Sequence, residues 1–217
     1  MGVSVPVNDA AARRTTETEA SMEPILVDVP ESIETERLLI RAPRAGDGSA
    51  VNAAKRETWP ALQQWMAWAA GEPSSVEEDE AFARRARAQF IERSDLLYFF
   101  LLKDSQEFVA SSGLHRIDWT VPKFEIGYWV RSRFEGQGYV SEGVRRLTQL
   151  AFDTLGAQRV EIRCDERNTR SRNVAERLGF QREGALRCDA RANDGTLRTT
   201  LVYGMVAADW STARDGR

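Results

Sequence analysis

The chain has 217 residues, 42% of them hydrophobic, and a formal net charge of −3. This length suits one domain, or one domain with a tail, and the apolar content is sufficient for a sizeable core. The charge balance shows no basic excess, so we expect no nucleic-acid partner.

Metal and membrane functions are also not expected. His115 is the only histidine, and the two cysteines, Cys164 and Cys188, have neither metal-site nor disulfide spacing. The longest apolar run, residues 96–102, is too short to span a bilayer, and the N-terminal residues contain no apolar leader segment. We therefore expect a cytoplasmic protein that binds no metal and no membrane.

Residues 1–31 differ in composition from the rest of the chain. They are rich in Ala, Thr, Glu and Pro and show little periodicity, which is typical of a flexible tail. Residues 25–29, Ile-Leu-Val-Asp-Val, could add a short strand to the sheet. We expect the folded domain to cover residues 32–212.

The domain is predicted to contain strands and helices in the order βααβββαβαββ. The segments follow from apolar residues that recur with the period of a strand or of a helix. In chain order they are a strand over 36–41, a helix starting at Asp47 or Ser49, a helix over 77–93, strands over 97–103, 107–117 and 124–130, a helix over 140–155, a strand over 159–163, a helix starting at Asn168 or Thr169, and strands near 185–191 and 197–206. This order is typical of an α/β or α+β domain with one mixed sheet.

A loop with two glycines lies between the predicted strand over 124–130 and the helix that follows. Residues 131–139 have the sequence Arg-Ser-Arg-Phe-Glu-Gly-Gln-Gly-Tyr. Gly136 and Gly138 allow backbone N–H groups to approach an anion closely, and the positive end of a helix lies behind them. The loop therefore predicts phosphate binding, although the same spacing also fits a turn that only joins a strand to a helix.

Two common nucleotide motifs do not fit this loop. Gly143 is misplaced for the third glycine of G-x-G-x-x-G. Gly138 to Gly143 has the spacing of the P-loop, but Val144-Arg145 replaces its Lys-Ser/Thr.

Several ordered motifs resemble the GNAT N-acetyltransferase superfamily. Arg133-x-x-Gly136-x-Gly138 is similar to the pyrophosphate loop of that family, and Asn168-x-x-Ser171 is similar to its second coenzyme A segment. The C-terminal motifs, from Glu183-Gly-Ala-Leu-Arg to Trp210, resemble the RimJ/RimL-type branch, which includes enzymes that acetylate N-terminal amines of ribosomal proteins. The likeness extends roughly from Ser32 to Trp210, and several motifs in order identify a family more safely than one.

The resemblance implies a mixed, mostly antiparallel sheet that is splayed in the middle and flanked by helices on both faces. Acetyl-CoA would lie in the gap, with its pyrophosphate at the glycine loop and its pantetheine arm along a strand edge. The residues implied in cofactor binding are Trp129, Val130 and Arg131 through their backbone, Arg133, Gly136, Gln137, Gly138 and Tyr139 in the loop, and Asn168 and Ser171 in the second segment. Related enzymes often form dimers, so a homodimer is compatible with the resemblance.

Acetyl transfer to an amine requires an unprotonated amine, a donor for the oxyanion and a proton for the departing thiolate. Glu125 is the candidate base, because it lies on the strand that leads to the glycine loop; a purely structural carboxylate is the alternative. Ser171 is the candidate proton donor by analogy with the family; it could instead only cap the first turn of its helix. Tyr139 could also donate, or could simply pack.

The acceptor site is less defined by the sequence. The substrate-side candidates are His115, Trp65 and Asp189, and Trp68 could also cover the acceptor site. Ordinary packing and hydrogen bonding would also explain the histidine and the tryptophans. RimJ/RimL-type members often carry a Glu or an aromatic pair where this chain has residues 189–192, so a ribosomal-protein acceptor does not follow. A peptide N-terminus and a small-molecule amine both stay open.

We therefore expect an acetyl-CoA-dependent N-acetyltransferase that uses direct attack in a ternary complex. Two alternatives belong to other classes of protein. The first is a non-catalytic acyl-CoA-binding sensor that keeps the loop but not the chemistry. The second is a structural interaction domain without affinity for coenzyme A.

Overall fold

The computed structural model describes residues 23–215 and the side chains of residues 23–212. The fold is an eight-stranded sheet with strand order β1-β2-β3-β4-β5-β6-β8-β7, in which all neighbours are antiparallel except β5 and β6. The strands are β1 (Ser32–Glu34), β2 (Leu38–Arg41), β3 (Leu96–Leu102), β4 (Phe108–Asp118), β5 (Lys123–Val130), β6 (Arg159–Asp165), β7 (Gln181–Arg191) and β8 (Leu197–Val206). The α-helices are α1 (Gly48–Trp65), α2 (Val76–Glu92), α3 (Tyr139–Gln149), α4 (Thr169–Arg177) and α5 (Ala207–Asp215). This architecture confirms the predicted mixed α/β fold.

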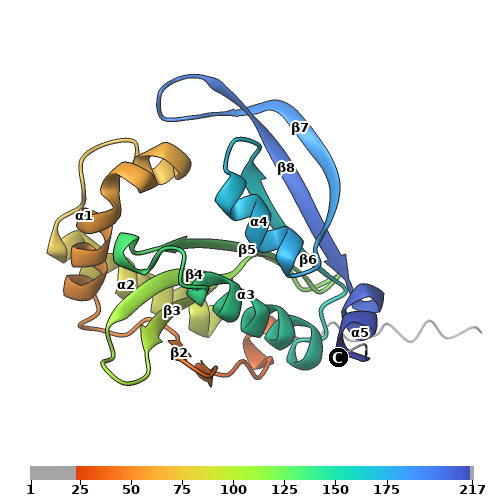
Figure 1. The fold of residues 1–217 in the computed structure, drawn as a ribbon. Helices are drawn as coiled ribbons and strands as arrows, with labels where there is room; N and C mark the ends of the chain where they lie inside the picture. The colour runs from red at the N-terminus through yellow and green to blue at the C-terminus, as the bar shows by residue number, and fades with distance from the viewer. Residues whose placement is uncertain (1–22, 216–217) are drawn as a thin grey trace, which may run out of the picture.

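Helices cover both faces of the sheet (Figure 1). Strand β3 is buried on both sides, and its side chains alternate between the two layers. Leu97 and Phe99 pack against α1 and α2, whereas Tyr98 and Phe100 belong to the larger cluster that contains α3 and α4. A continuous apolar run is the expected pattern for a strand covered on both faces.

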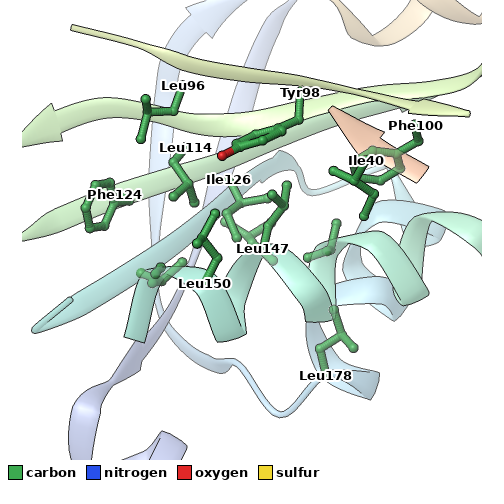
Figure 2. Close-up of a cluster of buried hydrophobic side chains, with 14 of the residues drawn as sticks. Ile40, Leu96, Tyr98, Phe100, Leu114, Phe124, Ile126, Leu147, Leu150 and Leu178 are labelled. Carbon is green, nitrogen blue, oxygen red and sulfur yellow. The ribbon is translucent and has the colours of Figure 1, made fainter. Parts of the chain in front are cut away.

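Helix α3 carries the predicted apolar stripe. Val144 and Leu147 are fully buried, and Leu150 and Ala151 continue the stripe into a π-helical turn over Leu150–Thr154. Figure 2 shows Leu147 and Leu150 facing the sheet residues of the main core. The spacing of four and three residues is therefore confirmed as the buried face of a helix.

The N-terminal boundary of the folded part differs from the prediction. Residues 1–22 of the predicted tail lie outside the described residues, but 23–31 pack on the domain. Pro24–Leu26 forms a 3-10 helix where a short strand was considered, Val29 is buried, and the carbonyl of Pro30 accepts a hydrogen bond from the Tyr98 hydroxyl at 2.6 Å. Short apolar contacts of this kind carry no periodicity that a sequence pattern could reveal.

Three other elements were not predicted in full. Helix α1 continues through the tryptophan-containing stretch to Trp65, whereas β1 and α5 are additional. β1 has three residues, which is too short for a period of two to be recognised. No helix within residues 23–215 is long and apolar enough to cross a membrane.

The parallel pair β5–β6 is the feature that positions the site. Only Lys123, Phe124 and Glu125 pair with β6, at Arg159, Val160 and Glu161. Beyond Glu125, β5 continues to Val130 with β4 on one edge, and no strand within residues 23–215 pairs with its other edge. The sheet is therefore splayed at its centre, as the resemblance implied.

Candidate active site

The edge of β5 that faces the gap presents unpaired backbone groups. The carbonyl of Pro122 accepts from the Gln158 N–H at 2.7 Å on the β6 side, whereas the N–H of Arg131 donates to the Val109 carbonyl at 2.9 Å on the β4 side. Backbone groups of successive strand residues point to opposite edges. By this alternation Tyr128 and Val130 face the gap.

Only one of the three predicted backbone partners thus faces the gap. Arg131 uses its N–H for Val109, and its carbonyl accepts from the Phe134 N–H at 2.9 Å. Trp129 points its backbone toward β4 and packs its ring against Phe108, with the ring centroids 5.5 Å apart. Tyr128, which the sequence analysis did not single out, takes the place of these two residues at the edge of the gap.

The glycine loop has the backbone conformation that its sequence suggested. A 3-10 helix over Ser132–Phe134 leads to Gly136 and Gly138, whose φ angles are 74° and 84°. Gly138 is the N-cap of α3, so the first-turn N–H groups of the helix lie next to the loop. A Cβ at Gly136 would meet no atom of the described part of the chain within 4 Å, which leaves that side of the loop open.

Two arginines of the loop are used to hold it. Arg131 and Arg133 each contact Glu57 of α1 and Glu107, which immediately precedes β4, with N–O distances between 2.7 and 3.0 Å. The backbone N–H of Ser132 also donates to the hydroxyl of Thr58 at 2.9 Å. Arg133, predicted to bind the cofactor, therefore directs its guanidinium to α1.

Glu57 is the centre of this network. Burial on its own would raise the pKa of Glu57, but hydrogen bonds from Arg133 and Arg131 lower it below its usual value. The carboxylate thus stays ionised and continues to bind both guanidinium groups. Glu57 and Glu107 carry no sequence signal, because their partners lie far away in the chain.

A further cation, Arg37, lies beside the loop. Its guanidinium donates to the Gln137 carbonyl at 3.1 Å, pairs with Glu142 at 2.6 Å and lies 4.2 Å from the centre of the Tyr139 ring. Tyr139 also contacts Phe134 edge-to-face at 5.8 Å. These contacts give Tyr139 a packing role, the alternative considered from the sequence.

Ser171 lies against β5 from the α4 side. Asn168 is the N-cap of α4, as predicted, and its Oδ1 accepts from the Ser171 N–H at 3.0 Å. The hydroxyls of Ser171 and Tyr128 are 3.0 Å apart. Burial raises the pKa of Tyr128, so this phenol stays protonated and can act as a donor. Burial likewise raises the pKa of the nearby thiol of Cys164.

Glu125 lies on the opposite face of the sheet, toward α1 and α2. Its cross-strand partner is His115, and side chains of directly paired residues share a face. The Glu125 carboxylate is 3.4 Å from Arg116 and 3.5 Å from Arg163. The Nδ1 atom of His115 lies 2.8 Å from Asp95. The two predicted catalytic residues thus lie on the two faces of the sheet, at the beginning of the gap.

Trp65 lines a cavity of about 310 Å³ at the end of α1. The other lining residues are Gln63, Gln64, Arg167, Ala192, Asn193 and Asp194. Asn193, at the tip of the β7–β8 hairpin, donates to the carbonyls of Gln63 and Met66 at 2.8 and 2.9 Å. The β7–β8 hairpin, labelled in Figure 1, therefore contacts the end of α1 through Asn193.

The other acceptor candidates lie outside this cavity. Asp189 is exposed on β7, and Trp68 packs against Trp59 with the ring centroids 6.1 Å apart. Lys55 lies 5.2 Å from the centre of the Trp68 ring. Among the side chains of residues 23–212, no three His, Cys, Asp or Glu groups gather in a way that could hold a metal ion.

Residues 37–181 match the family model described as acetyltransferase (GNAT) domain. The putative ribosomal N-acetyltransferase YdaF of Bacillus subtilis is 37% identical over 97 residues, which are 45% of this chain and 52% of that protein. This match therefore spans about half of that relative's length. The ribosomal-protein-serine acetyltransferase of Escherichia coli is 30% identical over 141 residues, which are 64% of this chain and 75% of that protein.

Solved structures share the same architecture. The microcin C7 self-immunity acetyltransferase MccE, in complex with acetyl-CoA and AMP, has a TM-score of 0.76 at 22% identity, over 82% of this chain and 97% of that one. The ribosomal L7/L12 α-N-protein acetyltransferase RimL, in complex with coenzyme A, has a TM-score of 0.74 at 22% identity, over 81% and 98%. These likenesses confirm the fold expected from the sequence.

Proposed function

Because the chain belongs to the GNAT acetyltransferase family, we propose that it transfers the acetyl group of acetyl-CoA to a primary amine. The observation that carries this proposal is the gap between β5 and β6, which combines a free strand edge with a glycine loop and a partly buried pair of hydroxyl groups. Each of these features could bind or act on a different part of a thioester cofactor.

Acetyl-CoA would bind along this gap. The backbone groups of Tyr128 and Val130 would pair with the pantetheine arm as an added strand does. The N–H groups around Gly136, Gln137 and Gly138 and the N-terminus of α3 would hold the pyrophosphate. Arg131 and Arg133 would hold the loop in place through Glu57 and Glu107, while Arg37 adds a positive charge beside it.

The reaction would be a direct attack of the amine on the thioester carbonyl. Backbone N–H groups of the strand edge would stabilise the oxyanion. The departing thiolate would take its proton from the Ser171 hydroxyl, which Tyr128 supports from 3.0 Å away. Glu125 is a carboxylate on the amine side of the gap, and its negative charge would favour the approach of a cationic substrate.

The acceptor would be the amine of a peptide N-terminus or of a small molecule. Two relatives carry names that refer to ribosomal proteins, which favours a peptide acceptor. Residues 189–192 differ from the Glu or aromatic pair that RimJ/RimL-type members often carry there, so a small-molecule amine is also compatible with the sequence. Thiol release from acetyl-CoA, measured over a panel of N-terminal peptides and polyamine-type amines, distinguishes them. Release with peptides alone supports a protein acceptor.

The same assay tests the two alternatives to an enzyme. A shift of the melting temperature with acetyl-CoA, but no thiol release over the panel, would indicate a sensor module. No shift at all would indicate a domain without cofactor affinity, because a ligand at a hundredfold excess over its Kd stabilises a protein by about 2.7 kcal/mol.

Ser171→Ala is expected to lower kcat by about 10²-fold, since the thiolate then loses a positioned proton donor. The affinity for acetyl-CoA should change little, because the hydroxyl acts on the leaving group. Tyr128→Phe should show a smaller loss of the same kind. Ser211→Ala, on helix α5, is the control and should behave as the native protein. An unchanged kcat in Ser171→Ala would remove this residue from the mechanism.

A further inference from the structure

The single histidine of the chain has a fixed ring orientation. His115 lies on β4, and its Nδ1 is 3.0 and 2.8 Å from the two carboxylate oxygens of Asp95. Asp95 is placed by the end of α2, where Arg93 adopts a left-handed φ of 62° and the chain turns into β3. Since Asp95 comes just after this cap, the turn presents its carboxylate to His115.

The ring lies over a pair of glycines. Gly113 and Gly127 are cross-strand partners on β4 and β5. A Cβ at Gly113 would lie 2.7 Å from Cε1 and 2.9 Å from Nε2 of His115, and a Cβ at Gly127 would lie 3.9 Å from Nε2. The ring can occupy this position only because Gly113 has no side chain, and Nε2 extends toward β5.

This position is at the beginning of the gap. Gly127 is two residues beyond Glu125, where the pairing of β5 with β6 ends. Ser171 approaches the same part of β5 from the other face through Tyr128. A thioester bound along the free edge would thus lie between Nε2 of His115 on one face and the Ser171 hydroxyl on the other.

Asp95 determines which nitrogen of His115 is a base. A carboxylate only accepts hydrogen bonds, so the Nδ1 of a neutral His115 carries the proton and Nε2 keeps a lone pair. Glu125, in contrast, faces the guanidinium groups of Arg116 and Arg163. The Glu125 carboxylate is thus engaged with two cations, whereas Nε2 of His115 faces β5.

We propose that His115 accepts the proton of the attacking amine at Nε2 and that Asp95 positions its ring. This inference rests on the acetyl transfer proposed above. The amine nitrogen bonds to the thioester carbonyl carbon, the carbon–sulfur bond breaks, and the amine proton moves to Nε2. The thiolate takes the proton of the Ser171 hydroxyl. Afterwards the imidazolium releases its proton to solvent water, and Ser171 regains a proton from the solvent. Asp95 stabilises the imidazolium, while Glu125 keeps its contacts with Arg116 and Arg163.

Nuclear magnetic resonance can test the geometry without any acceptor. In tag-free protein labelled with nitrogen-15 histidine, His115 is the only source of imidazole signals. We expect the neutral ring to carry its proton on Nδ1, both free and with coenzyme A bound. In Asp95→Asn the two tautomers should become mixed. A native ring protonated on Nε2 would overturn the proposal.

Kinetics test the role of the dyad. With the amine of the panel that releases most thiol, His115→Gln should lower kcat by about 10²–10⁴-fold and leave the acetyl-CoA melting shift unchanged. Asp95→Asn should lower kcat by about tenfold or more, as expected when a histidine base loses the carboxylate that fixes its tautomer. Added imidazole should restore part of the activity of His115→Ala. An unchanged kcat in His115→Gln overturns the proposal.

The dependence on pH separates His115 from its charged neighbours. The groups that face it are Asp95 before β3, Glu125 on β5 with its partner Arg116, and Glu161 and Arg163 on β6. The fall of kcat/KM toward acid pH should disappear in His115→Gln and persist in Glu125→Gln. Loss of this limb only in Glu125→Gln would assign the base to Glu125 instead. A native protein that neither binds acetyl-CoA nor releases thiol would contradict the proposed transfer, while the tautomer measurement would still decide the dyad geometry.

Discussion

Replacing Gly138 by valine is expected to abolish acetyl-CoA binding, with a loss of at least about 10²-fold in affinity. Gly138 has a φ of 84° and is the N-cap of α3, so its backbone lies where the proposed pyrophosphate contact requires a close approach. Among the described residues, the atom that a Cβ there would meet is a guanidinium nitrogen of Arg37, at 3.5 Å. The valine side chain should therefore block the ligand sterically while making few contacts with the protein itself. Titration calorimetry with acetyl-CoA measures the effect.

The matched control for this prediction is Gly156→Val. Gly156 has a φ of 66°, so the backbone strain is comparable, and a Cβ there would meet no atom of the residues that the structure describes within 4 Å. It follows the end of the π-helical turn, away from the glycine loop. Both variants should lose similar stability, but only Gly138→Val should lose acetyl-CoA affinity. Native affinity in Gly138→Val would rule out the loop as the pyrophosphate site.

Gly143→Ala is expected to destabilise the protein by about 1–3 kcal/mol or more through overpacking. Gly143 lies in the second turn of α3, and a Cβ there would be 2.1 Å from Cε2 of Phe100, whose ring is fully buried in the sheet. In an exposed helix the same change would stabilise by roughly 0.8–1.0 kcal/mol, so the sign of the effect is informative. The midpoint of urea unfolding gives the measurement.

Two further variants support the interpretation of Gly143→Ala. Gly184→Ala, on β7, adds a Cβ that would meet no atom within 4 Å and should be nearly neutral. Combining Gly143→Ala with Phe100→Leu should recover part of the lost stability, since the smaller side chain gives space to the new methyl group. A Gly143→Ala variant as stable as the native protein would show that α3 can move away from the sheet at little cost.

The regular elements were predictable because their signals are local. The stripe of Val144, Leu147 and Ala151 on α3 follows directly from the period of 3.6 residues. The cap at Asn168 follows from the side chain's ability to accept an N–H at a helix start, here that of Ser171. The two positive φ angles in the loop follow from glycine at 136 and 138.

Gly143 has a structural role that local sequence patterns do not predict. In the sequence it belongs to an incomplete nucleotide-binding spacing, whereas in the structure it allows α3 to lie against Phe100. The distinction depends on which ring lies opposite, and Phe100 is 43 residues away in the chain. Close packing makes the contact decisive, since interiors leave no room for even one extra methyl group.

The roles of the charged groups around the site could not be predicted from the sequence either. The sequence contains 30 Lys and Arg and 33 Asp and Glu residues, and nothing in it distinguishes Glu57 or Asp95 from the others. Glu57 acquires its role only where α1 meets the glycine loop, and Asp95 only where the end of α2 meets β4. Coulomb and hydrogen-bond interactions act over a few ångströms, so they are defined by folded neighbours and not by sequence spacing.

The amino-acid order by itself determined the class of fold, the glycine loop, a helix start at Asn168 or Thr169 and the family resemblance, because each depends on residues close together in the chain. The tertiary structure alone decided that Tyr128 faces the gap, that Arg131 and Arg133 hold the loop, and that His115 is oriented by Asp95. The physical reason is the splay of β5 from β6: it leaves one strand edge without partners, and only the folded sheet shows which side chains surround that edge.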